Sequence, residues 1–204
     1  FRQTFSDLVL REVGRIDSIV TRLLHFARPA PAALAPTSLE AILNDSLKLL
    51  EQQIRRRQVV LVKRFDAGRD MIMGDRDLLS QAFVNFILNA IESMDKGGTL
   101  TIATTLIETD GKRYLPDRKQ GRRLLRVDIT DTGCGIAPAE VSKVFDPFFT
   151  TKSDGTGLGL AVSHGIVEEH GATVSVESRL DVGTTFRLLF KLIEKDAATT
   201  VETD

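Results

Sequence analysis

Hydrophobic residues at the beginning of the chain recur at the spacing of a helix that pairs with another helix. They are separated by four, three, four and three positions, with polar and charged residues between them: Val9, Val13, Ile16, Val20 and Leu23. This spacing is a heptad seam. We therefore expect a helix over residues 1–28 and a homodimer formed through it.

Prolines end this helix and separate it from the rest of the chain. The alanine-rich stretch over residues 29–36 contains three prolines, and proline can neither donate a backbone hydrogen bond nor continue a helix. We interpret this stretch as a stiff linker. We expect residues 37–195 to form one globular domain and residues 196–204 to form a frayed tail.

Helical and strand patterns alternate within the globular domain. Helix patterns run from Thr37 or Ser38 to about Arg57, from Arg76 to Met94 after the N-cap Asp75, from Pro138 to Val144 and from Leu158 to His170. Strand patterns cover Val59–Phe65, Met71–Met73, Thr99–Ile107, Leu124–Thr130, Thr173–Ser178 and Thr184–Ile193, with a charged hairpin loop over Glu108–Arg123. This order predicts a two-layer α/β sandwich in which helices cover one face of a mixed sheet.

Composition narrows the class of protein. The chain has 204 residues, of which 42% are hydrophobic, enough for one domain and a small appendage. Its net charge of −1 gives no sign of nucleic-acid binding. The single cysteine, Cys134, excludes an internal disulfide. No apolar stretch reaches the length of a transmembrane helix. We expect the chain to be a fragment, because it begins with Phe1 and not with methionine. We expect this fragment to be cytoplasmic, while the whole protein could be anchored in the inner membrane through other segments.

The candidate chemistry lies in four motifs that follow one another along the domain. They are the pair Asn85 and Asn89, and the runs Asp131-Thr-Gly-Cys-Gly-Ile136, Phe145-Asp-Pro-Phe-Phe-Thr-Thr-Lys152 and Gly155-Thr-Gly-Leu-Gly-Leu160. Glycines let the backbone come close to phosphates, and a helix beginning in the last run offers free N–H groups to anionic oxygens. A carboxylate can accept a hydrogen bond from the exocyclic amine of adenine. The sequence therefore predicts a nucleotide site built without a P-loop.

These motifs, in this order and spacing, resemble the N, G1, F and G2 boxes of the sensor histidine kinases of two-component systems. The ATP-binding domain of that family has the Bergerat fold, as do gyrase, the mismatch-repair ATPase MutL and the heat-shock chaperone ATPases. The resemblance covers roughly Thr37–Ile193, and the helix before it resembles the second helix of the family's dimerisation hairpin. The F box is most similar to that of the nitrogen-regulation type.

The resemblance assigns the two ends of a nucleotide to different residues. It implies that Asn89 binds Mg²⁺ directly with the help of Asn85, and that Lys152 reaches the terminal phosphates of ATP. It also implies that Asp131 receives the adenine amine and that Thr185 supports the adenine edge. The other nucleotide contacts that it implies, including a lid from about Lys152 to Thr156, are Gly133, Gly135, Ile136, Phe148, Thr150, Thr151, Gly155, Thr156, Gly157, Leu158, Gly159 and Leu160.

Several of these residues also have a purely structural interpretation. Two asparagines on a helix can pair or cap, and Asp–Gly sequences often form turns. At least one phenylalanine of the F box is expected to seat the loop on the core. Glu92, one turn after Asn89, can be a solvent-exposed carboxylate or a functional one.

The activity that the resemblance implies is transfer of the ATP γ-phosphoryl group to a histidine, for relay to an aspartate of a response regulator. Hydrolytic relatives carry Glu at the position of Asn85, and an amide cannot take a proton from water. His25 does not match the acceptor motif, and we expect His164 and His170 to be structural. The acceptor is therefore expected upstream of residue 1, and the fragment is not expected to phosphorylate itself. A clamp ATPase of the same fold, an anti-sigma-type serine kinase and a non-catalytic nucleotide-sensing module are the alternatives.

Overall fold

The computed structural model describes residues 32–95, 97–109, 122–152 and 155–193. The helix predicted over residues 1–28, residues 29–31 of the predicted linker, most of the charged hairpin loop and the tail lie outside these described residues.

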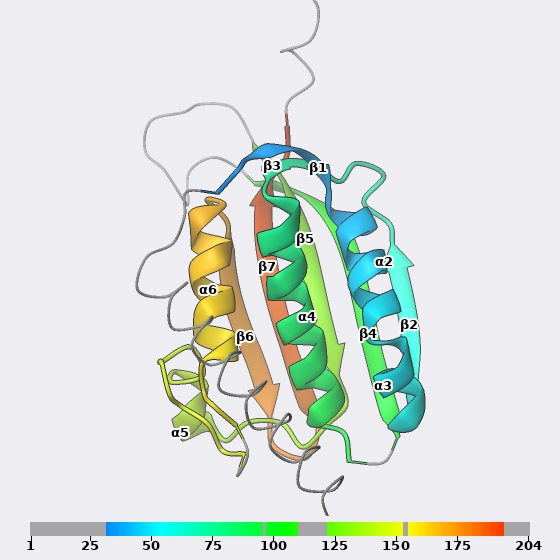
Figure 1. Ribbon diagram of the computed structural model, residues 1–204, viewed down its shortest axis with the longest axis vertical. Coiled ribbons are helices and arrows are strands. Elements are labelled where there is room, and N and C mark those ends of the chain that lie inside the picture. The colour runs from blue at the N-terminus through cyan, green and yellow to red at the C-terminus, as the bar shows by residue number, and fades with distance from the viewer. Residues whose placement is uncertain (1–31, 96, 110–121, 153–154, 194–204) are drawn as a thin grey trace, which may run out of the picture.

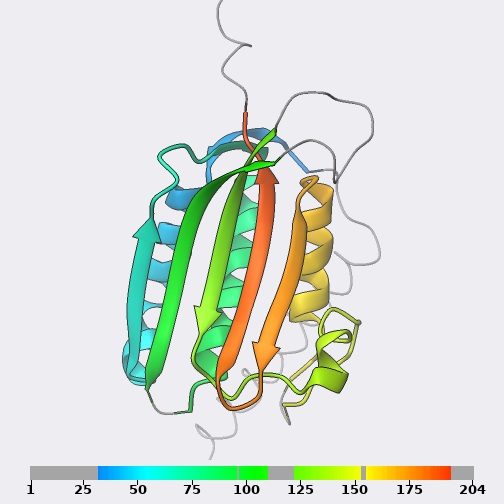
Figure 2. The same cartoon turned by 180° about the vertical axis from the view of Figure 1, so that it is seen from behind.

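A five-stranded mixed sheet forms one layer of the fold. Its strand order is β2-β4-β5-β7-β6, with β2 parallel to β4 and all other neighbours antiparallel. The strands are β2 (Val59–Phe65), β4 (Gly98–Thr109), β5 (Arg122–Asp131), β6 (Thr173–Arg179) and β7 (Gly183–Lys191). The helices α2 (Leu39–Leu49), α4 (Arg76–Glu92) and α6 (Gly159–Glu169) lie side by side over one face (Figure 1). From behind, the strands lie in front of these helices (Figure 2), which confirms the predicted two-layer α/β sandwich.

The helix predicted to end near Arg57 is in fact two helices. α2 is followed by α3 (Glu51–Arg56), and the break between them is at Leu50. The apolar spacing of Leu47, Leu50 and Ile54, all buried, continues across the break. A pattern read from the sequence therefore could not show it.

The predicted linker was too long. Ala35–Ser38 forms the strand β1, which pairs antiparallel with β3 (Met71–Gly74) in a separate two-stranded sheet. Ser38 also caps α2 as predicted, because its Oγ accepts a hydrogen bond from the N–H of Ala41 at 3.1 Å. The strand was missed because its pairing partner is distant in the sequence.

The remaining predicted elements are confirmed, with ends shifted by at most three residues; they include the short helix α5 (Pro138–Val141). None of the helices in the described part of the chain is both long and apolar enough to cross a membrane.

Aromatic rings fix α4 on the sheet. Phe83 and Phe86, both fully buried, lie with ring centroids 6.3 Å from Phe190 and 5.2 Å from Phe186, respectively. Because α4 is anchored to β7 in this way, its polar face is held toward α6 and the loops that carry the sequence motifs.

Asp75 joins three parts of the chain at the beginning of α4. Its Oδ1 accepts hydrogen bonds from the N–H of Asp77 at 3.0 Å and of Leu78 at 3.1 Å, and its Oδ2 accepts one from Ala33 at 2.9 Å. Its own N–H donates to Nε2 of His170, at the end of α6, at 2.9 Å. The N–H of Ala32 donates to the Glu169 carboxylate, also at the end of α6, at 3.0 Å. The chain that enters β1 is therefore attached to both α4 and α6.

Replacing Asp75 with alanine is expected to lower the free energy of unfolding by about 1 kcal/mol at neutral pH, the usual effect of losing an N-cap. The hydrogen bond from Leu78 is the main cause that lowers the pKa of Asp75. A carboxyl with a lowered pKa stabilises the fold above its unfolded pKa, and this contribution is lost as the pH falls through the folded pKa. Urea unfolding at neutral and at low pH measures both effects.

The matched control is Asp66→Ala, which removes an exposed carboxyl that caps no helix. Equal destabilisation by the two substitutions would contradict the capping role. The capping role would also be contradicted if Asp75→Ala lowered the free energy of unfolding as much at low pH as at neutral pH.

Candidate functional site

The candidate site lies at the C-terminal half of α4, where this helix faces the beginning of α6. Asn85 links the two helices, because its Nδ2 donates hydrogen bonds to Oγ of Ser163 at 3.2 Å and to the carbonyl oxygen of Gly159 at 3.4 Å. The first turn of α6, which follows the last glycine motif, is thereby held beside the asparagine pair. The side-chain amide of Asn85 therefore positions the beginning of α6.

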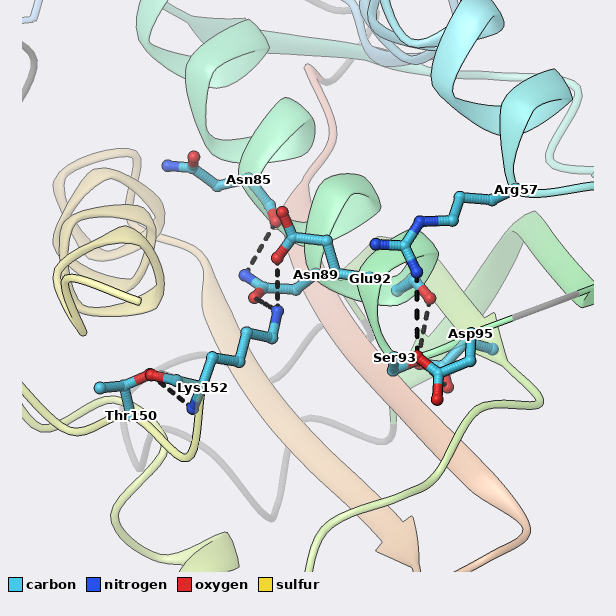
Figure 3. A network of polar contacts seen from close by, with 10 residues as sticks. Arg57, Asn85, Asn89, Glu92, Ser93, Asp95, Thr150 and Lys152 are labelled. Atoms are coloured by element: carbon cyan, nitrogen blue, oxygen red, sulfur yellow. Dashed lines mark hydrogen bonds and ion pairs between the residues drawn. The ribbon is translucent and has the colours of Figure 1, made fainter. Parts of the chain in front are cut away.

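Asn89 and Lys152, both predicted to lie at the phosphate end of a nucleotide, are in direct contact (Figure 3). Nδ2 of Asn89 donates to the carbonyl oxygen of Asn85 at 2.9 Å, so Oδ1 of Asn89 points away from the helix axis. Nζ of Lys152 donates to that Oδ1 at 3.1 Å and to Oε2 of Glu92 at 2.5 Å. A cation, the lysine ammonium, therefore lies at the amide oxygen that was predicted to bind a metal ion.

Asp131 ends β5 and is almost completely buried, with 3% of its surface exposed. Its Oδ1 accepts hydrogen bonds from the Ser93 hydroxyl at 2.9 Å and from the N–H of Gly133 at 2.8 Å. Burial raises the pKa of the Asp131 carboxyl, and these hydrogen bonds from Gly133 and Ser93 partly oppose the rise. The buried carboxylate is thus held in a fixed orientation by these two donors.

Ser93 connects the two ends of the site and was missed in the sequence. Its N–H donates to the carbonyl oxygen of Asn89 at 3.0 Å, while its hydroxyl binds Asp131. An added Cβ at Gly133 would lie 2.0 Å from Oγ of Ser93, so only glycine fits there. The spacing Asn85, Asn89, Ser93 is one turn of helix at each step, which was an available signal.

The predicted role of Thr185 at the adenine edge is wrong, because its side chain lies on the other face of the sheet. Its hydroxyl is 3.0 Å from that of Thr130. Thr184, which pairs with Asp131 in the register of β5 and β7, is buried on the side of the helices. Phe186 is buried on that side as well, so the alternation of a strand already indicated Thr184.

The loop after Asp131 is held against the β6–β7 hairpin. The N–H of Ile136 donates to Oγ of Ser178 at 2.8 Å, and this hydroxyl also lies 2.9 Å from that of Thr184. A Cβ added at Gly135 would lie 2.1 Å from the carbonyl oxygen of Arg179. Ser178 is a second positioning residue that no sequence motif indicated.

The phenylalanine-rich loop is seated by one ring and leaves another exposed. The ring of Phe145 lies 4.8 Å from that of His164 and 6.2 Å from that of Phe186. Phe148 is 65% exposed and has a positive φ of 68°. Its N–H donates to the carbonyl oxygen of Gly157 at 3.0 Å. The expectation that one phenylalanine seats the loop is met by Phe145.

The other predicted contact residues surround this loop. Oγ1 of Thr150 accepts a hydrogen bond from the N–H of Lys152 at 3.1 Å, and Thr151 is exposed. Oγ1 of Thr156 lies 3.5 Å from the N–H of Leu158, whose side chain is buried. Gly155 is exposed, Leu160 packs against the core, and Gly159 begins α6. The four motifs thus meet along one side of α4 and α6.

A comparison with protein families shows what this arrangement belongs to. Residues 74–194 match the profile of the histidine kinase-, DNA gyrase B- and HSP90-like ATPases, which is more than half of the chain. The chain belongs to this family. Membership confirms the fold that the motifs implied, and it implies that the chain binds ATP.

The similar proteins are sensor histidine kinases. The chain is 34% identical over 185 residues to the sensor histidine kinase ZraS of Escherichia coli K12, and this covers 90% of the chain but 36% of ZraS. It is also similar to full-length ShkA in complex with AMPPNP, with a TM-score of 0.73, 26% identity, and coverage of 95% of this chain and 40% of ShkA. The histidine kinase ThkA in complex with the response regulator TrrA has the same fold, with a TM-score of 0.72, 23% identity, and coverage of 92% of this chain and 50% of ThkA. The chain therefore spans well under half the length of its curated relative.

Proposed function

We propose that this chain is the ATP-binding catalytic region of a sensor histidine kinase, which transfers the γ-phosphoryl group of ATP to a histidine outside the three that it contains. The observation that carries the proposal is the pair of linked contacts on α4. At one end, Asn89 presents an oxygen to a cation. One turn further, Ser93 fixes the Asp131 carboxylate. A nucleotide needs these two features at its phosphate end and its base end.

Magnesium fits the phosphate end of the site. Oδ1 of Asn89 already accepts a hydrogen bond from the ammonium of Lys152, and Mg²⁺ prefers oxygen ligands and keeps several waters while bridging phosphates. Asn89 would hold the ion, and the chemistry that it supplies when bound is the neutralisation of charge on the phosphate oxygens. The free N–H groups in the first turn of α6 would bind phosphate oxygens.

Asn85 favours transfer over hydrolysis. Its amide binds Ser163 and Gly159, and an amide has no basic group that could take a proton from an attacking water. Catalysis by this chain would then consist of holding ATP in place, with Lys152 neutralising charge, for an acceptor that approaches from another segment. This is why we prefer a kinase to a clamp ATPase.

The partners follow from the resemblance. We propose that the phosphoryl group passes to an aspartate of a response regulator in the cytoplasm, because a related kinase of the same fold has been seen in complex with one. Dimerisation through residues 1–28 rests on the heptad seam, and the similarity to the nitrogen-regulation type rests on the F box.

Replacing Asn89 with alanine is expected to remove most of the gain in ADP affinity that Mg²⁺ gives to the wild-type chain. The reason is that Oδ1 of Asn89, which already accepts from a cation, is the oxygen proposed to bind the ion. Titration calorimetry with ADP, in Mg²⁺ and in EDTA, measures this gain. No adenine nucleotide binding by the wild type, or an unchanged gain in the variant, would contradict the proposal.

Asn44 provides a matched control for this substitution. It is a helix asparagine whose Nδ2 donates to the carbonyl oxygen of Glu40 at 3.0 Å and whose Oδ1 accepts from Nζ of Lys63 at 3.1 Å. These are the same kinds of contact that Asn89 makes, but they lie on α2. Asn44→Ala is expected to leave the affinity for ADP unchanged in both buffers.

Phosphoryl transfer requires a second experiment. With γ-labelled ATP and a chain extended upstream to include the preceding helix, we expect acid-labile, alkali-stable label on the protein, which is the signature of phosphohistidine. Rapid release of free phosphate without labelled protein would instead favour the clamp ATPase.

A further inference from the structure

Lys152 is held at the end of α4 by two residues that both belong to that helix. Its ammonium lies 3.1 Å from Oδ1 of Asn89 and 2.5 Å from Oε2 of Glu92 (Figure 3). The lysine comes from the end of the phenylalanine-rich loop, where Oγ1 of Thr150 accepts a hydrogen bond from its N–H. The side chains of Lys152 and Glu92 are 40% and 39% exposed, so both can exchange partners with little rearrangement.

The lysine and a metal ion cannot use Asn89 at the same time. A metal ion on Oδ1 of Asn89 would lie within a few ångströms of the ammonium, and like charges repel strongly at that separation. Binding of a metal–nucleotide complex at Asn89 therefore requires Lys152 to leave this oxygen. Once it leaves, the lysine is free to approach the negatively charged phosphates.

Glu92 sets how easily this exchange occurs. Its carboxylate is the other acceptor of the ammonium, and it forms the shorter of the two contacts. Without a negative charge at position 92, the lysine is held at Asn89 by one neutral amide oxygen. Charged acceptors bind an ammonium more strongly than neutral ones.

We propose that Glu92 is a positioning residue that keeps Lys152 on the metal-binding oxygen of Asn89 in the nucleotide-free protein, and that the metal–nucleotide complex displaces the lysine from both residues. This inference rests on the proposed function, because it concerns the same site. The sequence allowed Glu92 to be either a solvent-exposed carboxylate or a functional one. The inference gives it a function, in a cation exchange that accompanies nucleotide binding.

The test is a double-mutant cycle measured by titration calorimetry with ADP. The proteins are the wild-type chain, Glu92→Gln, Lys152→Met and the double variant, each in Mg²⁺ and in EDTA. In Mg²⁺, Glu92→Gln is expected to tighten ADP binding about threefold to fivefold, the upper range for losing an exposed ion pair. In the Lys152→Met background, and in EDTA, the same substitution is expected to change nothing.

Three other results would contradict the proposed displacement of Lys152 or the function on which it rests. If Glu92→Gln tightens binding equally with and without Lys152, or more in EDTA, then the carboxylate merely repels the phosphates. If Glu92→Gln weakens binding in Mg²⁺, then Glu92 supports the metal directly. If the wild-type chain binds no nucleotide at all, the proposed function itself is contradicted. Failure of the proposed function and failure of the exchange are therefore distinguishable.

A matched control separates local effects from a change in net charge. Glu177→Gln removes a carboxylate that also forms an ion pair, with Arg187 at 2.9 Å, and it lies on β6. Arg187 also binds Asp128, and its position next to Phe186 on β7 places this cluster on the face opposite the helices. Glu177→Gln is expected to leave ADP affinity unchanged in Mg²⁺, and an equal tightening by Glu177→Gln and Glu92→Gln would overturn the proposal.

Discussion

Replacing Asp131 with asparagine is expected to weaken ADP binding by about tenfold to a hundredfold while the fold is retained. One oxygen of Asp131 already accepts hydrogen bonds from Ser93 and Gly133. If the amide oxygen of the variant keeps these donors, its NH₂ group faces the amine of adenine, donor against donor. A buried hydrogen bond to a charged group is worth about 1.5–3 kcal/mol. ADP titration measures the loss, and thermal unfolding checks the fold.

The same variant is expected to bind GDP relatively better than the wild type does, because its NH₂ group can donate to the guanine carbonyl oxygen. Asp128→Asn is the control, since this residue lies on the same strand but binds Arg187 on the other face of the sheet. An unchanged preference for adenine over guanine in the Asp131 variant would contradict the role of this carboxylate.

The pH dependence of binding gives an independent check on Asp131. Because burial raises the pKa of this carboxyl, ADP affinity is expected to fall with decreasing pH through a pKa above that of an ordinary aspartate. Ser93→Ala removes a donor that opposes the rise, so it is expected to move the fall to higher pH. The idea is wrong if the affinity falls at the same pH in the Ser93 variant and the wild type.

The second large effect is expected at Gly157, in the glycine motif that precedes α6. Gly157 has a φ of 66°, and a Cβ at this position would lie 2.3 Å from the carbonyl carbon of Phe148. Phe148 itself has a positive φ, so neither backbone can move aside without losing the hydrogen bond between them. Strain of this kind costs about 1–3 kcal/mol. Gly157→Ala is therefore expected to weaken ATP binding by about tenfold or more, as measured by titration calorimetry.

A second glycine offers the matched control. A Cβ added at Gly165, inside α6, would meet no atom within 4 Å beyond its chain neighbours and the backbone of its own helix. Gly165→Ala is expected to stabilise the fold by about 0.5–1 kcal/mol, as alanine does in a helix, and to leave ATP binding unchanged. If both alanine variants bind ATP like the wild type, the close contact between Gly157 and Phe148 does not matter for nucleotide binding.

Local chemistry made most of the fold predictable from the sequence. Asp75 and Ser38 cap helices because their short polar side chains can reach backbone N–H groups. The strand Val59–Phe65 was predicted with its observed ends because it begins with an apolar run rich in valine. Each of these signals lies within a few residues of the element that it specifies.

The features that were missed depend on distant parts of the chain or on strand alternation. The strand Ala35–Ser38 exists because β3 is available to pair with it, and the contact of Glu92 with Lys152 exists because a loop folds back onto α4. The assignment of Thr185 was a different error, since the burial of Phe186 together with strand alternation already indicated Thr184. The residues of the site could be named from motifs, but their partners could not.

The attachment of the entering chain has a mechanical consequence. Ala33 is bound to the cap of α4 and Ala32 to the end of α6, so a pull or twist applied to the preceding segment acts on both helices at once. These helices carry Asn89 and Gly159, which lie on the two sides of the site. A pull on the chain that leads into the domain is therefore expected to change the distance between the Asn89 amide and the first turn of α6.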